Sequence, residues 1–158
     1  MVLSKLFESR RLVEFTDSDD NTFYYEYDDK GLRTKKITPD ETIDYYYDDD
    51  KLVSQFSDSN RLDFLYDEDD LLYGFILDKT KIYFYLKDSL QNILGIVDEN
   101  GERIVGYESN AYGKTYVYFD NSANNLAEIN PFRYKGYYFD EESEMFYCTP
   151  RYYVPEWC

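Results

Sequence analysis

Runs of aspartate are the part of this sequence whose residue types and spacing most readily suggest chemistry. The runs at residues 17–21, 48–50 and 67–70 place oxygen ligands close together, and Ca²⁺ prefers oxygen ligands. A helix–loop–helix calcium site also needs glycine at its sixth position, where the first run has Thr22, and it needs flanking helices, whereas strand-like sequence flanks the runs. Because turns favour aspartate, we interpret the runs as solvated turns and predict no metal site.

The sequence also gives little evidence for a catalytic nucleophile, a cysteine metal site or a catalytic pair of carboxylates. The sequence contains no histidine, so a thiol nucleophile would lack its usual activating base, and Cys148 and Cys158 do not have a metal-binding spacing. A structural role for Cys148 is favoured, and a disulfide between the two cysteines stays open. Among 33 acidic residues some pair will reach the separation of a glycosidase site by chance, and no specific motif supports one. We therefore predict a non-enzymatic protein without catalytic residues or cofactors.

Composition favours strands over helices. Tyrosine and phenylalanine together number 31 of 158 residues, and aromatic side chains suit a pleated, half-buried surface. The net charge of −16 repels phosphate backbones, so nucleic-acid binding is disfavoured, and the charge is interpreted as promoting solubility. The first 15 residues contain no apolar run of signal-peptide length, and no stretch is apolar enough for membrane insertion.

The aspartate runs belong to an internal repeat of about 20 residues. An aromatic residue recurs at intervals of 20, 20, 19 and 19 residues, and a leucine follows each aromatic by five positions. Three repeats carry a Tyr-Asp pair. The aromatic positions are Phe7, Tyr27, Tyr47, Tyr66 and Tyr85, and the leucines are Leu12, Leu32, Leu52, Leu71 and Leu90.

Each repeat predicts one β-hairpin and a second connection. Tyr25 and Tyr27 alternate with polar residues, which is the period of a half-buried strand. Asp28 can accept backbone N–H bonds in the following turn, and Gly31 can adopt the positive φ that precedes the return strand. Later repeats have Lys51 or Asp70 in place of this glycine, so their turns must differ or carry strain.

Turn signals come closer together after residue 83. They lie at residues 88–91, 98–101 and 110–113, and the middle one contains Asn-Gly between the predicted strands 93–97 and 103–107. One more strand is predicted at residues 115–118. Residues 119–129 break the strand pattern, and we expect a loop there with one helical turn near residues 123–128.

The C-terminal end combines aromatic rings with arginines. We expect strands at residues 132–139 and 145–148, joined at residues 140–144, followed by an aromatic segment at residues 151–153. Arg133 and Arg151 are expected to stack on tyrosine faces inside the fold. The predicted fold is therefore all-β, with consecutive antiparallel hairpins forming a curved, twisted sheet and the C-terminal aromatic segment folded back on it.

The stretch NPFRYKGYYFDEESEMFYCTPRYYVP at residues 130–155, together with the Tyr-Asp repeats, resembles the Rhs/YD-repeat family and its Rhs-associated core region. Gln91, Ser109 and Asn110 depart from the usual residues of that core region. By the resemblance the chain divides into YD-repeat hairpins at residues 1–82 and the core region at residues 83–158. The structural signature residues are Tyr27, Asp28, Gly31, Tyr47, Asp48, Tyr66, Asp67, Asp98, Gly101, Pro131, Arg133, Gly136, Tyr137, Arg151, Tyr152, Tyr153 and Pro155.

The resemblance implies a segment of a hollow β-shell that encloses a toxin in contact-dependent competition between cells. Implied partners are the remaining repeats of the shell or a downstream toxin domain, with self-association through open sheet edges, at a secreted or cell-surface location. The family's Asp before Pro155 is Val154 here, and no Asp-Pro pair exists, so the self-cleaving aspartyl site has no candidate. The few repeats and the end at Cys158 suggest a fragment or remnant that lacks the toxin. The alternative is a carbohydrate-binding surface module that uses exposed tyrosines and Trp157.

Overall fold

The computed structural model describes residues 4–8, 11–149 and 151–155 as a single long sheet with a small second sheet inside its curve. The long sheet contains twelve strands that pair antiparallel in chain order, each with its neighbour. The strands are β1 (Ser4–Glu8), β2 (Arg11–Thr16), β3 (Thr22–Tyr27), β4 (Arg33–Ile37), β5 (Thr42–Asp48), β6 (Lys51–Phe56), β7 (Arg61–Tyr66), β8 (Leu72–Leu77), β9 (Lys81–Lys87), β10 (Ile93–Val97), β11 (Arg103–Ser109) and β12 (Thr115–Asp120).

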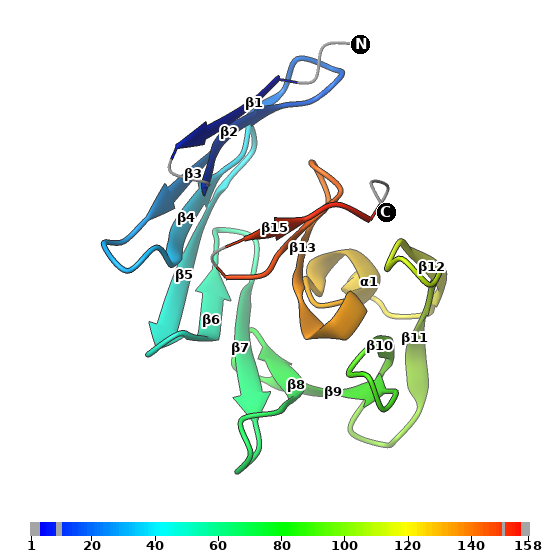
Figure 1. Cartoon of the computed structure of the whole chain (residues 1–158). Coiled ribbons are helices and arrows are strands. Elements are labelled where there is room, and N and C mark those ends of the chain that lie inside the picture. Colours follow the sequence, from blue (N-terminus) through cyan, green and yellow to red (C-terminus); the bar gives the residue numbers. More distant parts are fainter. Residues whose placement is uncertain (1–3, 9–10, 150, 156–158) are drawn as a thin grey trace.

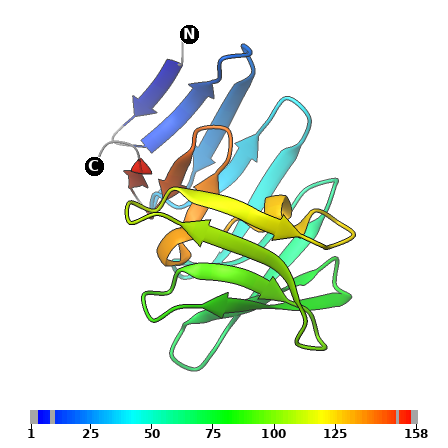
Figure 2. The same ribbon diagram turned by 90° about the vertical axis from the view of Figure 1, so that its right-hand side faces the viewer.

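The sheet curls around the C-terminal part of the chain (Figure 1). That inner part contains the short helix α1 (Leu126–Ile129) and a three-stranded sheet of β13 (Tyr138–Asp140), β14 (Met145–Tyr147) and β15 (Tyr152–Tyr153). After a quarter turn, β11 and β12 lie in front of the inner part, and β1 to β3 lie at the far end (Figure 2). The prediction of an all-β fold with consecutive hairpins in a curved sheet is confirmed.

The concave face of the sheet carries the core. Alternate residues of successive strands point inward, and Phe75, Leu62 and Ile96 are completely buried. Most of the buried apolar side chains form one cluster that joins β5 through β11 to α1 and the inner sheet, and a smaller cluster joins Leu12, Phe15 and Tyr25 to Met145. Both clusters contain side chains from the sheet and from the inner part, so the core lies between these two layers.

One turn design recurs along both rims of the sheet. The side-chain oxygen Oδ1 of the first turn residue accepts the backbone N–H of the fifth, and the fourth residue adopts a positive φ. Two further backbone hydrogen bonds close each turn. The first residues of the six turns are Asp17, Asp28, Asp67, Asp88, Asp98 and Asn110. The predicted use of Asp28 as an acceptor and of Gly31 at positive φ is confirmed.

Turns without glycine meet the same backbone requirement in two ways. Asp70 adopts φ 60° at the position of Gly31, so that turn carries the strain that the sequence predicts. The turn before Lys51 differs from the five-residue design, as expected, because Lys51 already lies in β6 and the left-handed residue is Asp49, with φ 57°. In this hairpin Asp48 pairs directly with Lys51, and a shorter turn replaces the five-residue design.

The fifth repeat lies two residues later than the sequence spacing suggests. The turn at Asp88 corresponds to the turn at Asp28, which places Lys87 rather than Tyr85 at the end of its strand. Tyr85 instead points into the core, and Leu90 lies in the turn with 65% of its surface exposed. Because Lys87 lacks an aromatic ring, the spacing of aromatic residues points to Tyr85 as the strand-ending residue, which is incorrect.

The C-terminal end differs from the single strand predicted at residues 132–139. Phe132 forms an isolated bridge with Tyr138, a 3₁₀ turn spans Tyr134–Gly136, and β13 begins only at Tyr138. Lys135 and Gly136 have φ values of 52° and 67°, which a strand cannot accommodate. The predicted strand at 145–148 ends one residue earlier, at Tyr147, and β15 covers only part of the predicted segment 151–153.

The expected loop at residues 119–129 is shorter than predicted. β12 continues through Asp120, and the helical turn is α1, which starts at Leu126 rather than near residue 123. The hairpin predicted around Asn100 is present as β10 and β11, but Gly101 alone takes the positive φ, at 82°. The turn is therefore of the five-residue design and not a two-residue Asn-Gly turn.

Replacing Gly101 with alanine tests the backbone requirement of these turns. A Cβ atom at Gly101 would meet nothing within 4 Å, so any loss of stability reports the left-handed φ alone. We expect Gly101→Ala to lower the free energy of unfolding by about 1 kcal/mol, measured by urea denaturation. Gly101→Asn is the control and should lose less, because asparagine tolerates this conformation. Equal stability of all three proteins would contradict the proposed role of the turn.

Added calcium tests the interpretation of the aspartate runs. Since Oδ1 of Asp17 and of Asp67 already accepts two backbone N–H groups each, we expect millimolar Ca²⁺ to leave the melting temperature unchanged. Mg²⁺ at the same ionic strength is the control for charge screening. A rise in melting temperature with Ca²⁺ alone would show that a site forms.

Candidate functional site

The junction between the curved sheet and the inner sheet contains a buried cluster of charged residues. Arg33, at the start of β4, is completely buried and donates a 2.6 Å hydrogen bond from Nη1 to Oδ2 of Asp140, at the end of β13. Nζ of Lys36 lies 3.1 Å from Oδ1 of Asp140 and 3.0 Å from both carboxylate oxygens of Glu142. The hydroxyl of Tyr25 donates to Glu142 at 2.5 Å, so two cations and two carboxylates neutralise each other.

Tyrosine rings surround the guanidinium group of Arg33. The rings of Tyr138 and Tyr147 lie 4.7 Å from its Cζ, that of Tyr45 lies 4.8 Å away, and that of Tyr25 lies 5.5 Å away. Nε and Nη2 of Arg33 are buried without a hydrogen-bond partner, so these ring faces supply the stabilisation that water would give elsewhere. Two of the rings come from the curved sheet and two from the inner sheet, and the arginine therefore joins both layers.

The charges set one another's protonation states. Burial alone would raise the pKa of Asp140, but Arg33 and Lys36 outweigh burial and hold this pKa below its ordinary value. Burial would likewise lower the pKa of Lys36, and Asp140 with Glu142 raises it instead. Burial first, and then the charges of Asp140 and Glu142, raise the pKa of Tyr25. At neutral pH Asp140 and Lys36 are thus both charged.

A second anchor lies where the signature begins. Asn130 is completely buried; its Oδ1 accepts the hydroxyl of Tyr85 at 2.7 Å, and its Nδ2 donates to the carbonyl of Phe132 at 2.9 Å. The guanidinium group of Arg133 lies 4.4 Å from the ring centre of Tyr107 and donates to the carbonyls of Asn130 and Ala127. The predicted stacking of Arg133 on a tyrosine face is therefore present.

The strand-ending tyrosines of the repeats link one hairpin to the next. The hydroxyl of Tyr27 donates to the carbonyl of Leu12, and that of Tyr66 donates to the carbonyl of Leu52, each at 2.7 Å. Tyr27 also reaches the inner sheet, because its hydroxyl lies 2.8 Å from that of Tyr152. The tyrosine of the Tyr-Asp pair thus connects its own hairpin to the preceding one.

The remaining signature residues occupy several environments. Tyr47 lies on the concave face and is half-buried, whereas Asp48, Asp98 and Gly101 lie at exposed hairpin ends. Pro131 and Pro155 are buried, and the ring of Tyr153 stacks with that of Tyr134. Tyr137 is 37% exposed. Arg151 is exposed, and its carbonyl accepts the N–H of Cys148, so the structure does not bring it into the buried cluster.

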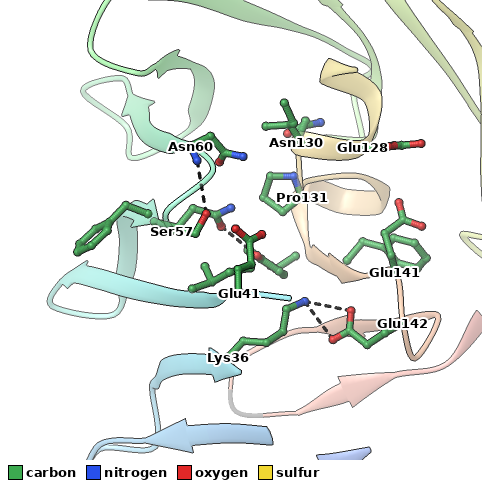
Figure 3. Close-up of a pocket in the computed structure, with 15 residues that line it drawn as sticks. Lys36, Glu41, Ser57, Asn60, Glu128, Asn130, Pro131, Glu141 and Glu142 are labelled. Carbon is green, nitrogen blue, oxygen red and sulfur yellow. Dashed lines mark hydrogen bonds and ion pairs between the residues drawn. The ribbon is translucent and has the colours of Figure 1, made fainter. Parts of the chain in front are cut away.

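A cleft of about 240 Å³ opens beside the buried cluster, between β4 to β7 and the inner part (Figure 3). Glu41, Glu141 and Glu142 contribute carboxylates to its walls, and Lys36 points toward Glu142. Among the residues that the structure describes, no three histidine, cysteine, aspartate or glutamate side chains are placed to hold one metal ion. Lys36 and Glu142, which both line the cleft, are paired with each other at 3.0 Å.

Sequence reasoning missed Arg33, Lys36 and Asp140. One signal was available, since Arg33 directly follows the repeat leucine Leu32 and Lys36 follows three residues later. Charged residues on a repeat strand are ordinarily exposed to solvent, and no local pattern identifies partners more than 100 residues away. Trp157 and Cys158, the proposed sugar platform and disulfide partner, lie outside the described residues, as do residues 9 and 10 of the first repeat.

Comparison with curated proteins finds relatives among bacterial tRNA nucleases. The chain is 30% identical over 134 residues to the tRNA nuclease WapA of Bacillus subtilis strain 168, and 29% identical over 134 residues to the tRNA3(Ser)-specific nuclease WapA of Bacillus spizizenii. Each match covers 83% of this chain and 6% of the relative. The chain thus spans only a small part of the length of these relatives. No family model matches the sequence.

Solved structures share the fold over nearly the whole chain. TcdB2-TccC3 without its hypervariable C-terminal region superposes with a TM-score of 0.75 and 17% identity, covering 97% of this chain and 8% of that one. The Tc holotoxin pore of Photorhabdus luminescens superposes with a TM-score of 0.71 and 16% identity, over 97% and 8% of the two chains. The curved sheet with an inner C-terminal part is therefore the fold of a segment within those larger chains.

Neutralising Asp140 tests the buried cluster. Asp140→Asn leaves Arg33 and Lys36 buried with too little negative charge, so we expect it to lower the free energy of unfolding by roughly 3 to 5 kcal/mol at pH 7. Asp63→Asn, which removes the carboxylate partner of Arg61 on the more exposed face, is the control and should lose less than about 1 kcal/mol. Urea denaturation measures both.

The stability difference between the wild-type protein and Asp140→Asn should depend on pH in a direction that the pKa of Asp140 determines. The folded-state pKa of Asp140 lies below its ordinary value of 3.8, so its contribution is complete above that value and is lost as the pH falls through the folded-state pKa. The difference between the wild-type protein and Asp140→Asn should therefore shrink below pH 3.8. A difference that stays constant down to full acid unfolding would contradict the depressed pKa.

Proposed function

Since this chain belongs to the Rhs/YD-repeat family, we propose that it is a non-enzymatic wall segment of a toxin-enclosing shell. The fold of TccC3 chains and the sequence similarity to WapA support this proposal. The observation that carries it is the curved sheet that closes on its own C-terminal part through the ionised Arg33–Asp140 cluster. A sheet held at a fixed curvature is what a wall requires.

The resemblance to the family suggests a separate role for each of two parts of the segment. Residues 1–82 would supply repeat hairpins of the wall, and residues 83–158 the core region that turns inward. β9 spans this boundary, and the sheet continues through it without a break. The remaining repeats would pair along β1, and a toxin domain of the same protein would lie inside the shell. The described part of the chain has no helix long and apolar enough to cross a membrane.

This function places the protein outside the cell or at its surface, where competition between cells occurs. The name of WapA refers to nuclease activity, but the chain matches only 6% of that protein, and we assign no catalytic activity to the matched segment. The carbohydrate-binding alternative stays a prediction. Exposed rings such as Tyr46 and Tyr73 are present on the described surface, and retention on a glycan matrix that is lost in Tyr46→Ala would favour it.

A graft tests the wall function. The segment of TcdB2-TccC3 that superposes on this chain is replaced by this chain, and the purified protein is treated with trypsin. If the chain forms a wall, the C-terminal region of the graft should resist cleavage about as well as in the parent protein. A graft carrying Asp140→Asn is the matched control and should be cleaved faster, because its junction is weakened.

Cleavage of the unmodified graft as fast as the separately produced C-terminal region would contradict the wall function. A parallel measurement of melting temperature distinguishes a misfolded graft from a folded but open one. A folded, open graft would show that the fold alone is insufficient for enclosure.

A further inference from the structure

The outer edge of β12 is unprotected in a way that the opposite edge is not. Tyr116, Val117 and Tyr118 are 53%, 50% and 76% exposed, and the charged residue of this strand, Asp120, lies at its end and accepts two backbone N–H groups of the following loop. β1, at the other edge, carries Lys5 and Glu8 among its five residues. Proteins usually protect edge strands with charge or proline, since unpaired backbone groups recruit other strands.

The chain does not continue the sheet past β12. Oδ1 and Oδ2 of Asp120 accept the backbone N–H groups of Ser122 and Ala127 at 2.7 and 2.8 Å, and these bonds turn the chain inward to α1. All later described strands belong to the inner sheet. A strand added beside β12 must therefore come from elsewhere in the sequence or from another molecule.

A cleft lies beside β12, and the charged residues that line it favour a cationic partner. It has a volume of about 210 Å³, its floor includes Phe139 and Pro155, and Glu141 and Glu144 contribute carboxylates to its walls. Lys114 also lines it. The side chain of Glu141 is 63% exposed and has an ion pair with Arg133 at 3.3 Å. Together with the net charge of −16, these carboxylates attract a cationic partner and oppose a second copy of this acidic chain.

We propose that the edge of β12 and the adjoining cleft bind an extended cationic polypeptide as an added antiparallel strand. Its backbone pairs with β12, its apolar side chains lie beside the exposed Tyr116 and Tyr118, and its alternate lysine or arginine side chains reach Glu141 and Glu144. The alternation follows from the period of two in a strand. This surface is separate from the buried cluster, so the inference does not depend on the wall function.

The probe is a fluorescent seven-residue peptide of alternating lysine and valine, and its binding to the 158-residue chain is measured by fluorescence anisotropy. Two further peptides carry N-methyl groups on the lysines only or on the valines only. Alternate residues of a strand direct their N–H groups to the same neighbour, so one methylated peptide should lose binding and the other should keep it. Equal retention or equal loss in the two would contradict strand addition.

The protein variants test the charge. Glu144→Gln should weaken binding by about two- to fivefold, the effect of one exposed ion pair. Glu102→Gln, in the distant turn between β10 and β11, is the matched control and should leave binding unchanged. Equal weakening by both variants would show nonspecific attraction and would overturn the proposal. So would absence of binding by the unmethylated peptide, or a dimer in sedimentation that excludes the peptide, which would assign the edge to a second copy.

Discussion

The ion pair between Arg33 and Asp140 is the interaction on which the arrangement of the two layers depends. Arg33 comes from the fourth strand of the curved sheet and Asp140 from the inner sheet, 107 residues later. A buried pair of this kind adds little net stability relative to apolar residues, but separating its members leaves uncompensated buried charge. Its consequence is therefore specificity: positions of the inner sheet that do not bring Asp140 to Arg33 and Lys36 are strongly disfavoured.

This constraint complements the local construction of the curved sheet. Every strand of that sheet pairs with its neighbours in sequence, so its hairpins form with short loop closures. Bulges between neighbouring strands bend the sheet locally, but such local features do not determine what lies inside the curl. The buried tyrosines bind both the cluster and the inner strands, as the hydroxyl contacts of Tyr45 with Tyr138 and of Tyr27 with Tyr152 illustrate. We infer that the long-range contacts fix the curvature that the local contacts leave open.

The sequence predicts well what is repeated and poorly what occurs once. The spacing of Tyr27, Tyr47 and Tyr66 predicts successive hairpins, because each repeat reports the same local turn and strand. Arg33 occurs once, and its burial depends on Asp140 and on ring faces from four separate strands, which no local pattern reveals. The misplacement of the fifth repeat has a related cause, since Lys87 replaces the tyrosine there while its side chain still reaches a backbone carbonyl, that of Leu72.

The acidity of the chain also follows from its construction. An aspartate at the start of a five-residue turn accepts backbone N–H groups that would otherwise lack partners. Hydrogen bonds from the side-chain amides of Asn21 and Asn92, and then from backbone N–H groups, lower the pKa of Asp17 and Asp88, and the backbone N–H of Glu102 is the main cause that lowers the pKa of Asp98. Most of these turns therefore add a carboxylate at an end of a hairpin whether or not the charge has a further role. Asn110 forms the same turn without a charge, which shows that the backbone needs the side-chain oxygen and not the negative charge. The net charge of −16 is thus partly a consequence of repeating one turn along an open sheet, and it limits which molecules can approach that sheet's free edge.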